Sequence, residues 1–478
     1  MEPNLKLNVA HVVDTLGNVI GRDQQIMTME KACDLVSLID EADLRDSQVV
    51  FFDPFCKAGE ILLACAHLSC FAKSCMDVRA VQKELYESGR YFGLSPDERH
   101  HRLSLRTFLG NTHSHDERLQ QMIKNGNYLS EIDGCLDRKK FIEEFNKMLE
   151  YISNTSKPKK IIAVGNPPYQ EKYKSNGSNS GANLIYHHLL NSIMDHAKIN
   201  EFIMVIPARW FAGGRGKSLR IFASKLRLSK QLKQICDFQN SKMIFPQVDV
   251  KGGVCFVHWD RDYSGDTLFV SQDEPPIYVD LSSDEIIMRS QFARTVVNKV
   301  KARGLASMSK YARSWNIFDL ASNYFDKHGD DNGSDVIDCF TKQKVIRKID
   351  RAKIKSNKLE IDMFKVVVPK AVGTGGDTYR KEQVFILEKG QICTETYMVL
   401  GSFSKRQDAE LLLNYLQTGF VRFLVSVKKI TQDITKDTWC LVPCVDITKK
   451  WTDKDLFELF QLTPEEQVHI RQKVLEWS

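Results

Sequence analysis

The chain has 478 residues, of which 42% are hydrophobic and 27% are charged, and its net charge is +6. This composition is typical of folded proteins with room for two or three domains, and it excludes extensive disorder. No run of about 18 apolar residues occurs, and the first residues lack the pattern of a signal peptide. We therefore expect no membrane association and a cytoplasmic location.

The 12 cysteines are scattered along the chain, and several lie within apolar segments, where a reduced thiol behaves as a small hydrophobic group. Only Cys440 and Cys444 lie close together. Because no second pair has the spacing of zinc ligands, the sequence predicts no metal site.

The first 260 residues alternate short apolar runs with helical patterns. Residues 138–152 place Phe141, Phe145, Met148 and Ile152 on one face of a helix. Strand-like runs include SQVVFFDPF, the beginning of GRYFGLSPDERHHRLSLRTFLG, KIIAVG, NEFIMVIPARWF and GGVCFVHW. Strands that alternate with helices predict an α/β fold, with a mostly parallel sheet covered on both faces.

The pattern changes near residue 260, where short strands and turns become mixed with helices. Within this part, residues 406–430 read as one helix. We place a domain boundary between residues 265 and 266, which predicts an α/β domain over 1–265 and a mixed α+β domain over 266–478.

Two loops are the best candidates for a ligand site, because each follows a predicted parallel strand. Ligands of open parallel sheets bind beyond the carboxyl ends of the strands. The first loop, DPFCKAGE, begins with Asp53, a hydrogen-bond acceptor, and contains Gly59, which allows close approach of a ligand to the backbone. It is neither G-x-G-x-x-G nor a phosphate-binding loop, so dinucleotide binding and nucleotide hydrolysis lose support.

The second loop, GNPPYQ, is more specific. An amine conjugated to a ring is a poor nucleophile, because its lone pair is delocalised into the ring. The side-chain oxygen of Asn166 and the carbonyl of Pro167 can accept the two amine hydrogens, and Pro168 and the fixed φ of proline restrict the loop. Tyr169 offers a flat face for the ring. The alternative is a proline turn that only ends the strand.

The pair DPFCKAG and GNPPY, about 110 residues apart, resembles the gamma-class amino-methyltransferases, the DNA adenine-N6 methyltransferases of restriction-modification systems. The segments FIMVIPARWFAGGRGKSLRIF and IFPQVDVKGGVCFVHW are similar to later segments of that family. The resemblance extends from about residue 20 to residue 260. It implies a Rossmann-like S-adenosylmethionine-dependent methyltransferase domain, with residues 266–478 in the place of a target recognition domain.

The same resemblance implies residue roles. Asn166 to Tyr169 would form the catalytic loop. Asp97 or Ser95 would bind the cofactor ribose, where the family has an acidic residue, and Asn127 stands where it has an aspartate. Met29 and Lys57 also depart from the family's usual proline and glycine. The implied cofactor-binding residues are Thr28, Asp53, Pro54, Phe55, Cys56, Gly59, Ser95, Asp97 and Asn127.

Basic residues in the C-terminal half are candidates for contacts with double-stranded DNA. The run from 342 to 358 holds eight Lys or Arg and one Asp, a density that can neutralise phosphates. A solvated surface explains the run equally well. The candidate contacts are Lys342, Lys344, Arg347, Lys348, Lys428 and Lys429.

The resemblance therefore implies a site-specific DNA adenine-N6 methyltransferase that flips its target base out of the duplex. A glutamine-N5 protein methyltransferase is an alternative, because that family also uses N-P-P-Y on an amide nitrogen. An RNA methyltransferase is a further alternative, because the motif does not distinguish RNA from DNA. A binding module with a degenerate cofactor fold is another. No nuclease motif is evident, so a separate restriction endonuclease would be the partner in a restriction system.

Overall fold

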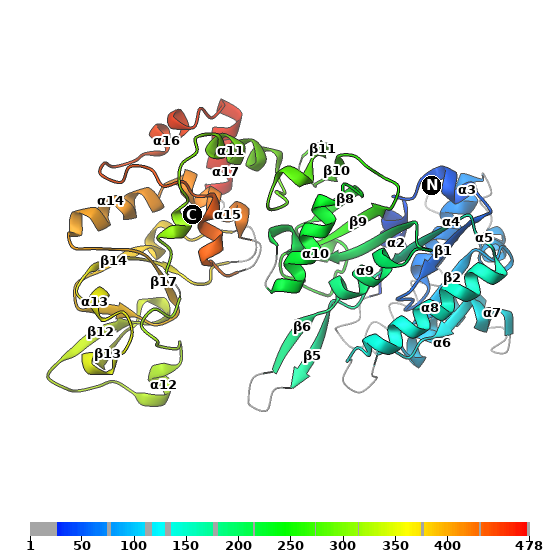
Figure 1. The fold of residues 1–478 in the computed structure, drawn as a ribbon, viewed down its shortest axis with the longest axis horizontal. Helices are drawn as coiled ribbons and strands as arrows, with labels where there is room; N and C mark the ends of the chain where they lie inside the picture. The colour runs from blue at the N-terminus through cyan, green and yellow to red at the C-terminus, as the bar shows by residue number, and fades with distance from the viewer. Residues whose placement is uncertain are drawn as a thin grey trace. The chain divides into compact units, whose positions relative to one another are not determined.

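A computed structural model describes residues 26–73, 78–109, 117–129, 135–174, 180–213, 216–272, 274–313, 315–373, 377–429 and 432–475 (Figure 1). The chain forms two compact units, Met1–Glu285 and Ile286–Ser478. The first 25 residues of the predicted 1–265 domain lie outside the described residues. No described helix has both the length and the apolar character needed to span a bilayer.

Unit 1 is built on a nine-stranded sheet with the order β11-β10-β8-β9-β7-β4-β1-β2-β3. The five strands β7, β4, β1, β2 and β3 run parallel to one another, whereas β9 and β11 run antiparallel to their neighbours. The strands are β1 Val49–Asp53, β2 Tyr91–Ser95, β3 Ile123–Asn125, β4 Lys160–Gly165, β7 Glu201–Pro207, β8 Leu232–Phe238, β9 Val254–Asp260, β10 Thr267–Val270 and β11 Ile277–Val279.

Helices cover both faces of this sheet, as the sequence predicts. Neighbouring residues of a strand point to opposite faces. In β1, Phe51 belongs to one apolar cluster with helix α4, while Phe52 stacks on Phe145 of α8 with ring centroids 5.6 Å apart. The helices are α2 Met29–Val36, α3 Glu41–Arg45, α4 Glu60–Ala72, α5 Val78–Glu87, α6 Glu98–Leu109, α7 Glu117–Met122, α8 Arg138–Thr155, α9 Tyr186–Asp195 and α10 Lys217–Leu228.

The α/β fold with a mostly parallel sheet is confirmed, and so is the amphipathic helix at 138–152. Helix α8 begins after Asp137, whose carboxylate accepts the Lys140 amide at 3.0 Å. Its predicted apolar residues are all buried. Strands β10 and β11 lie in unit 1 because they extend its sheet, so the division at 285/286 falls after the predicted boundary at 265/266.

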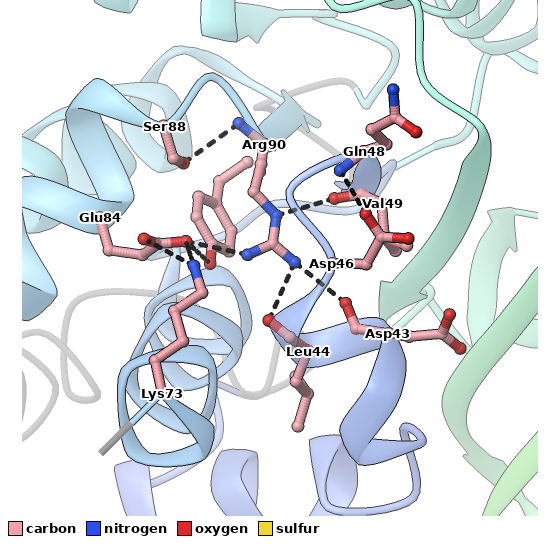
Figure 2. A network of polar contacts seen from close by, with 10 residues as sticks. Asp43, Leu44, Asp46, Gln48, Val49, Lys73, Glu84, Ser88 and Arg90 are labelled. Atoms are coloured by element: carbon pink, nitrogen blue, oxygen red, sulfur yellow. Dashed lines mark hydrogen bonds and ion pairs between the residues drawn. The ribbon is translucent and has the colours of Figure 1, made fainter. Parts of the chain in front are cut away.

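The ends of the strands opposite the two candidate loops are tied together by Arg90, whose side chain is 2% exposed (Figure 2). Its guanidinium donates to the carbonyls of Asp43, Leu44 and Val49 at 2.9–3.1 Å. It also pairs with Glu84 at 2.9 Å. One buried cation thus links α3, α5 and β1 just before β2 begins.

Unit 2 is a mixed α+β unit with two three-stranded sheets, β13-β12-β16 and β15-β14-β17. Its strands are β12 Val336–Phe340, β13 Ile346–Asp350, β14 Phe364–Pro369, β15 Phe385–Leu387, β16 Gln391–Cys393 and β17 Tyr397–Phe403. Its helices are α11 Gln291–Ala302, α12 Tyr324–His328, α13 Lys358–Ile361, α14 Arg406–Leu416, α15 Gly419–Lys428, α16 Asp453–Leu459 and α17 Pro464–Leu475.

The prediction of one helix over 406–430 is wrong, because two helices, α14 and α15, occupy this segment. Thr418 has an extended backbone and caps α15 by accepting the Val421 amide. The next two amides, of Gly419 and Phe420, donate to the carboxylate of Asp453 at 3.0 and 2.8 Å. A partner 33 or more residues away therefore stabilises the break, and helical periodicity does not reveal it.

Candidate active site

The two candidate loops meet at the point where the strand order reverses. The chain runs from β1 outward through β2 to β3 and then returns to β4 on the other side of β1. Ligands of open α/β sheets bind in the crevice at such a switch point. Asp53 is the last residue of β1, and Asn166 directly follows β4, so both stand at this crevice.

The DPFCKAG loop is held by hydrogen bonds to β2, to α6 and to the segment after β3. The Cys56 amide donates to the Leu94 carbonyl at 3.1 Å. The Tyr128 hydroxyl donates to the Pro54 carbonyl at 2.8 Å, and the Ser104 hydroxyl donates to the Lys57 carbonyl at 3.0 Å. These contacts fix a backbone that is almost entirely buried.

Asp53 and Glu60 are carboxylates buried at either end of this loop, 1% and 2% exposed. Oδ1 of Asp53 accepts the Phe55 amide at 2.9 Å, and Glu60 accepts the amides of Met27 and Ala58, both at 3.2 Å. Burial, followed by the nearby charge of Glu60, raises the pKa of Asp53 well above its usual value. Burial also raises the pKa of Glu60.

Lys57, the departure from the family's usual glycine, is also buried in this loop, at 5% exposed. Burial lowers its pKa to about 8, while the charges of Glu60 and Asp53 oppose that shift. The charges of both carboxylates thus act on the Lys57 ammonium. In the sequence, Lys57 is notable only because it replaces the family's usual glycine. No sequence pattern indicates that the Glu60 carboxylate accepts a hydrogen bond from the Met27 amide.

Gly59 has a backbone conformation that favours glycine. Its φ of +75° is left-handed, and a Cβ there would lie 3.3 Å from the Phe108 ring. Helix α4 begins at the next residue, so its first amides open beside the loop.

The other predicted cofactor residues differ in exposure and in their hydrogen bonds. Thr28 is exposed and caps α2, and the neighbouring Met27 amide binds Glu60. Ser95, at the end of β2, is fully buried, and its hydroxyl has no hydrogen-bond partner among the described residues. Asn127 is exposed, with a φ of +43°.

Asp97 is buried, and its carboxylate accepts hydrogen bonds from the His100 amide at 2.9 Å and the His100 ring at 2.7 Å. Burial raises its pKa, but these bonds outweigh burial, so the pKa lies below its ordinary value. The carboxylate is engaged within the protein, so the identity of the ribose ligand stays a prediction.

The GNPPY loop is packed against the end of the sheet. Asn166 is 3% exposed, and Pro167 is buried. The half-buried Tyr169 ring meets the rings of Tyr186 and Phe245 edge to face, with centroids 6.5 Å apart in each pair. Its hydroxyl lies 3.4 Å from the Val205 carbonyl oxygen. These contacts fix the orientation of the ring while leaving part of it accessible.

A two-stranded hairpin, β5 Gln170–Lys174 and β6 Ser180–Leu184, follows this loop directly. The Ile185 amide donates to the Tyr169 carbonyl at 3.1 Å and so closes the base of the hairpin. Tyr186, at the start of α9, is fully buried, and its hydroxyl has no partner among the described residues.

The predicted DNA-contacting residues are distributed over unit 2 and differ in exposure. Arg347 pairs with Asp330 at 2.9 Å, and Lys348 pairs with Asp338 at 2.5 Å. Lys342 and Lys344 lie in the exposed turn between β12 and β13. The two basic residues at the end of α15 are buried: Lys428 beside Asp437, and Lys429, whose pKa burial lowers to about 8.

Among the described residues, no three His, Cys, Asp or Glu side chains gather closely enough to hold a metal ion. The expectation that the chain needs no metal stays a prediction.

Comparison with known proteins finds one family model and one curated relative that resemble part of this chain. Residues 73–245, which include the GNPPY loop, match the Eco57I restriction-modification methylase model. An uncharacterized adenine-specific methylase of Mycoplasma pneumoniae is 26% identical over 161 residues, which cover 31% of this chain and 38% of that protein. The chain thus spans well under half the length of this relative.

Solved structures show weaker likeness. The Type IIL restriction-modification enzyme MmeI, determined in complex with DNA, is 11% identical with a TM-score of 0.47, covering 99% of this chain and 76% of the other. A type I methyltransferase subunit from Streptococcus thermophilus is 12% identical with a TM-score of 0.35, covering 61% and 56%. Over residues 73–245, which hold the N-P-P-Y loop, this chain is thus similar to the Eco57I restriction-modification methylases.

Proposed function

We propose that the chain is a site-specific DNA adenine-N6 methyltransferase that uses S-adenosylmethionine. The observation that supports this most strongly is the position of Asn166. It follows β4 at the switch point of the sheet, beside the strand that ends in Asp53. A strand terminator needs neither an asparagine nor a tyrosine there, whereas methylation of a ring-conjugated amine uses both.

The residues around Asp53 suit the proposed cofactor. The left-handed Gly59, the N-terminus of α4 and the buried Ser95 hydroxyl, which has no hydrogen-bond partner among the described residues, lie around this loop. Asp53, Phe55, Gly59 and Ser95 would hold the cofactor. When bound, S-adenosylmethionine supplies a methyl group on an electrophilic sulfonium.

The catalytic loop contributes hydrogen-bond acceptors and orientation. The Asn166 side-chain oxygen and the Pro167 carbonyl accept the two amine hydrogens, which directs the nitrogen lone pair out of the ring. Tyr169, already oriented by its neighbours, contacts the ring face. Much of the rate acceleration then comes from holding the nitrogen in line for attack. An adenine within a duplex must first leave the base stack to reach this loop.

Unit 2 would recognise the target DNA, and the Lys and Arg residues of its surface would contact phosphates. Where cleavage accompanies methylation, a separate endonuclease would perform it. The alternatives, methylation of glutamine or of RNA, share the loop chemistry and differ in the acceptor.

Transfer of a tritiated methyl group from S-adenosylmethionine to unmethylated DNA, RNA and protein tests this proposal. We expect label in DNA, recovered as N6-methyldeoxyadenosine after digestion. Asn166→Ala should abolish transfer while binding of S-adenosylmethionine stays within about twofold, because the cofactor loop is intact. Asn332→Ala, an exposed change in unit 2, is the matched control. Label confined to RNA or protein would overturn the proposal.

A further inference from the structure

The turn between β12 and β13, residues 342–346, has an unusual backbone. The strands pair up to Phe340 and Ile346, and the Thr341 amide donates to the Val345 carbonyl at 2.8 Å. Gln343 and Lys344 are both left-handed, with φ of +60° and +61°. Hairpins that need two such residues normally use Asn-Gly. Two long side chains in this position carry a steric cost that suggests a function.

Contacts on one side of the turn hold this conformation. The Lys344 amide donates to the Tyr397 hydroxyl at 3.0 Å, and Nζ of Lys344 donates to the Glu382 carbonyl at 2.7 Å. The same Nζ lies 4.5 Å from the centroid of the Phe385 ring, which meets Tyr397 edge to face. Lys344 therefore anchors the turn to the strands behind it, and its charge is not directed away from the unit.

The other side of the turn presents groups to solvent. Lys342, Gln343, Val345 and Ile346 are exposed, the last two at 52% and 49%. About half of each of these two side chains faces solvent, and neither belongs to the apolar cores of unit 2. Among the described residues Lys342 forms no ion pair, whereas Arg347 and Lys348 are neutralised by aspartates on neighbouring segments.

We propose that the 342–346 turn enters a groove of duplex DNA and reads base edges. This assignment rests on the proposed function, because it takes DNA as the substrate. A two-stranded β-ribbon fits the major groove, a glutamine amide can pair with adenine, and apolar side chains contact thymine methyl groups. Gln343, Val345 and Ile346 supply such groups, Lys342 contacts a phosphate, and Lys344 is a positioning residue.

Charge complementarity favours DNA over a protein partner. Residues 342–346 carry two basic side chains and no acidic one, and the exposed Lys342 forms no ion pair among the described residues. A rigid turn also loses little conformational freedom on binding, which increases affinity.

The test uses the full-length chain and sequencing of the methylated sites. Gln343→Ala should relax the preference at one base pair by about tenfold, the size of one lost bidentate contact. The double change Val345→Ser with Ile346→Ser should lower kcat/KM for DNA at least about tenfold, with S-adenosylmethionine affinity unchanged. Val468→Ser, a change at a similarly exposed apolar residue, is the control and should behave as wild type.

Variants of Lys342 and Lys344 test whether the first contacts a phosphate and the second positions the turn. Lys342→Gln should reduce the slope of log affinity against log salt by about one, because one phosphate contact is lost. Lys344→Met should lower kcat/KM for DNA but leave the salt slope unchanged, and Lys344→Arg should restore part of the activity. A salt slope that falls for Lys344→Met and not for Lys342→Gln would reverse the two roles.

The outcomes distinguish the two proposals. If the wild type does not methylate DNA, the proposed function and this assignment fail together. If the wild type methylates DNA and the turn variants keep its site preference and rate, only this assignment fails. It also fails if the apolar double change alters only self-association in sedimentation experiments, because the turn would then be a contact between copies.

Discussion

The carboxylate of Asp53 lies directly against Gly165. Oδ1 of Asp53 is 2.8 Å from the position that a Cβ on Gly165 would occupy, and the Phe55 ring is 3.2 Å from it. Gly165 ends β4 and precedes Asn166. The cofactor loop and the catalytic loop are therefore in contact through a residue that has no side chain.

Gly165→Ala should displace Asp53 and disturb both loops, since real Cβ atoms do not approach an oxygen so closely. We expect S-adenosylmethionine affinity to fall at least about tenfold and kcat/KM about a hundredfold, the scale of a misplacement of about 1 Å. Calorimetry and methyl-transfer assays measure these two effects. Gly333→Ala is the control, because its nearest neighbour would be 3.6 Å away. Unchanged cofactor binding in Gly165→Ala would show that Asp53 moves without consequence.

Removal of the hydroxyl should change the free energy of unfolding in opposite directions for two buried tyrosines beside the loops. Tyr128 donates to the Pro54 carbonyl at 2.8 Å, so Tyr128→Phe should lower the free energy of unfolding by about 1 kcal/mol and weaken cofactor binding. The Tyr186 hydroxyl has no partner among the described residues, so Tyr186→Phe should raise the free energy of unfolding by about 1 kcal/mol. Urea denaturation compares them, and a loss of stability in Tyr186→Phe would contradict the second expectation.

Arg90 should matter for stability and not for catalysis, because its network lies at the strand ends away from the loops (Figure 2). Arg90→Met leaves the Asp43, Leu44 and Val49 carbonyls without their donor. We expect a loss of about 3 kcal/mol in the free energy of unfolding, with kcat per folded molecule unchanged. Arg102, whose side chain is 75% exposed, pairs with Glu98, and Arg102→Met should lower the free energy of unfolding by less than about 1 kcal/mol. Equal losses in the two variants would show that the Arg90 network adds nothing.

Lys57 should make stability depend on pH above neutrality. Its pKa is about 8 in the folded chain and 10.5 for an ordinary lysine, because burial disfavours the charged form. Between these values the unfolded chain binds more protons, so the free energy of unfolding rises with pH. Below pH 8 the full cost of burying the cation is present.

The difference in stability between the wild type and Lys57→Met should therefore shift in favour of the wild type by about 3 kcal/mol from pH 8 to 10.5. Denaturation at a series of pH values measures it. Lys83→Met, at an exposed lysine, should show no such shift. A pH-independent difference for Lys57→Met would mean that Lys57 is charged, or neutral, throughout this range.

Much of unit 1 follows from local sequence. The apolar run before Asp53 and the run before Asn166 form the predicted strands, and the spacing of Phe141, Phe145 and Met148 gives the predicted helix. Residues within one turn of a helix, or along one strand, set these patterns. Proline and glycine mark where the elements end.

Long-range contacts decided the rest. Local sequence does not predict that β1 and β4 are neighbours or that Asp53 packs on Gly165. Nor does it predict that the Asp453 carboxylate stabilises the break before α15. It also does not show that the aspartates of other segments neutralise Arg347 and Lys348 while Lys342 stays exposed. Periodicity records which face of an element is apolar. Which groups meet depends on strand pairing and burial across the whole unit, so only the tertiary structure supplied the contact between the two loops.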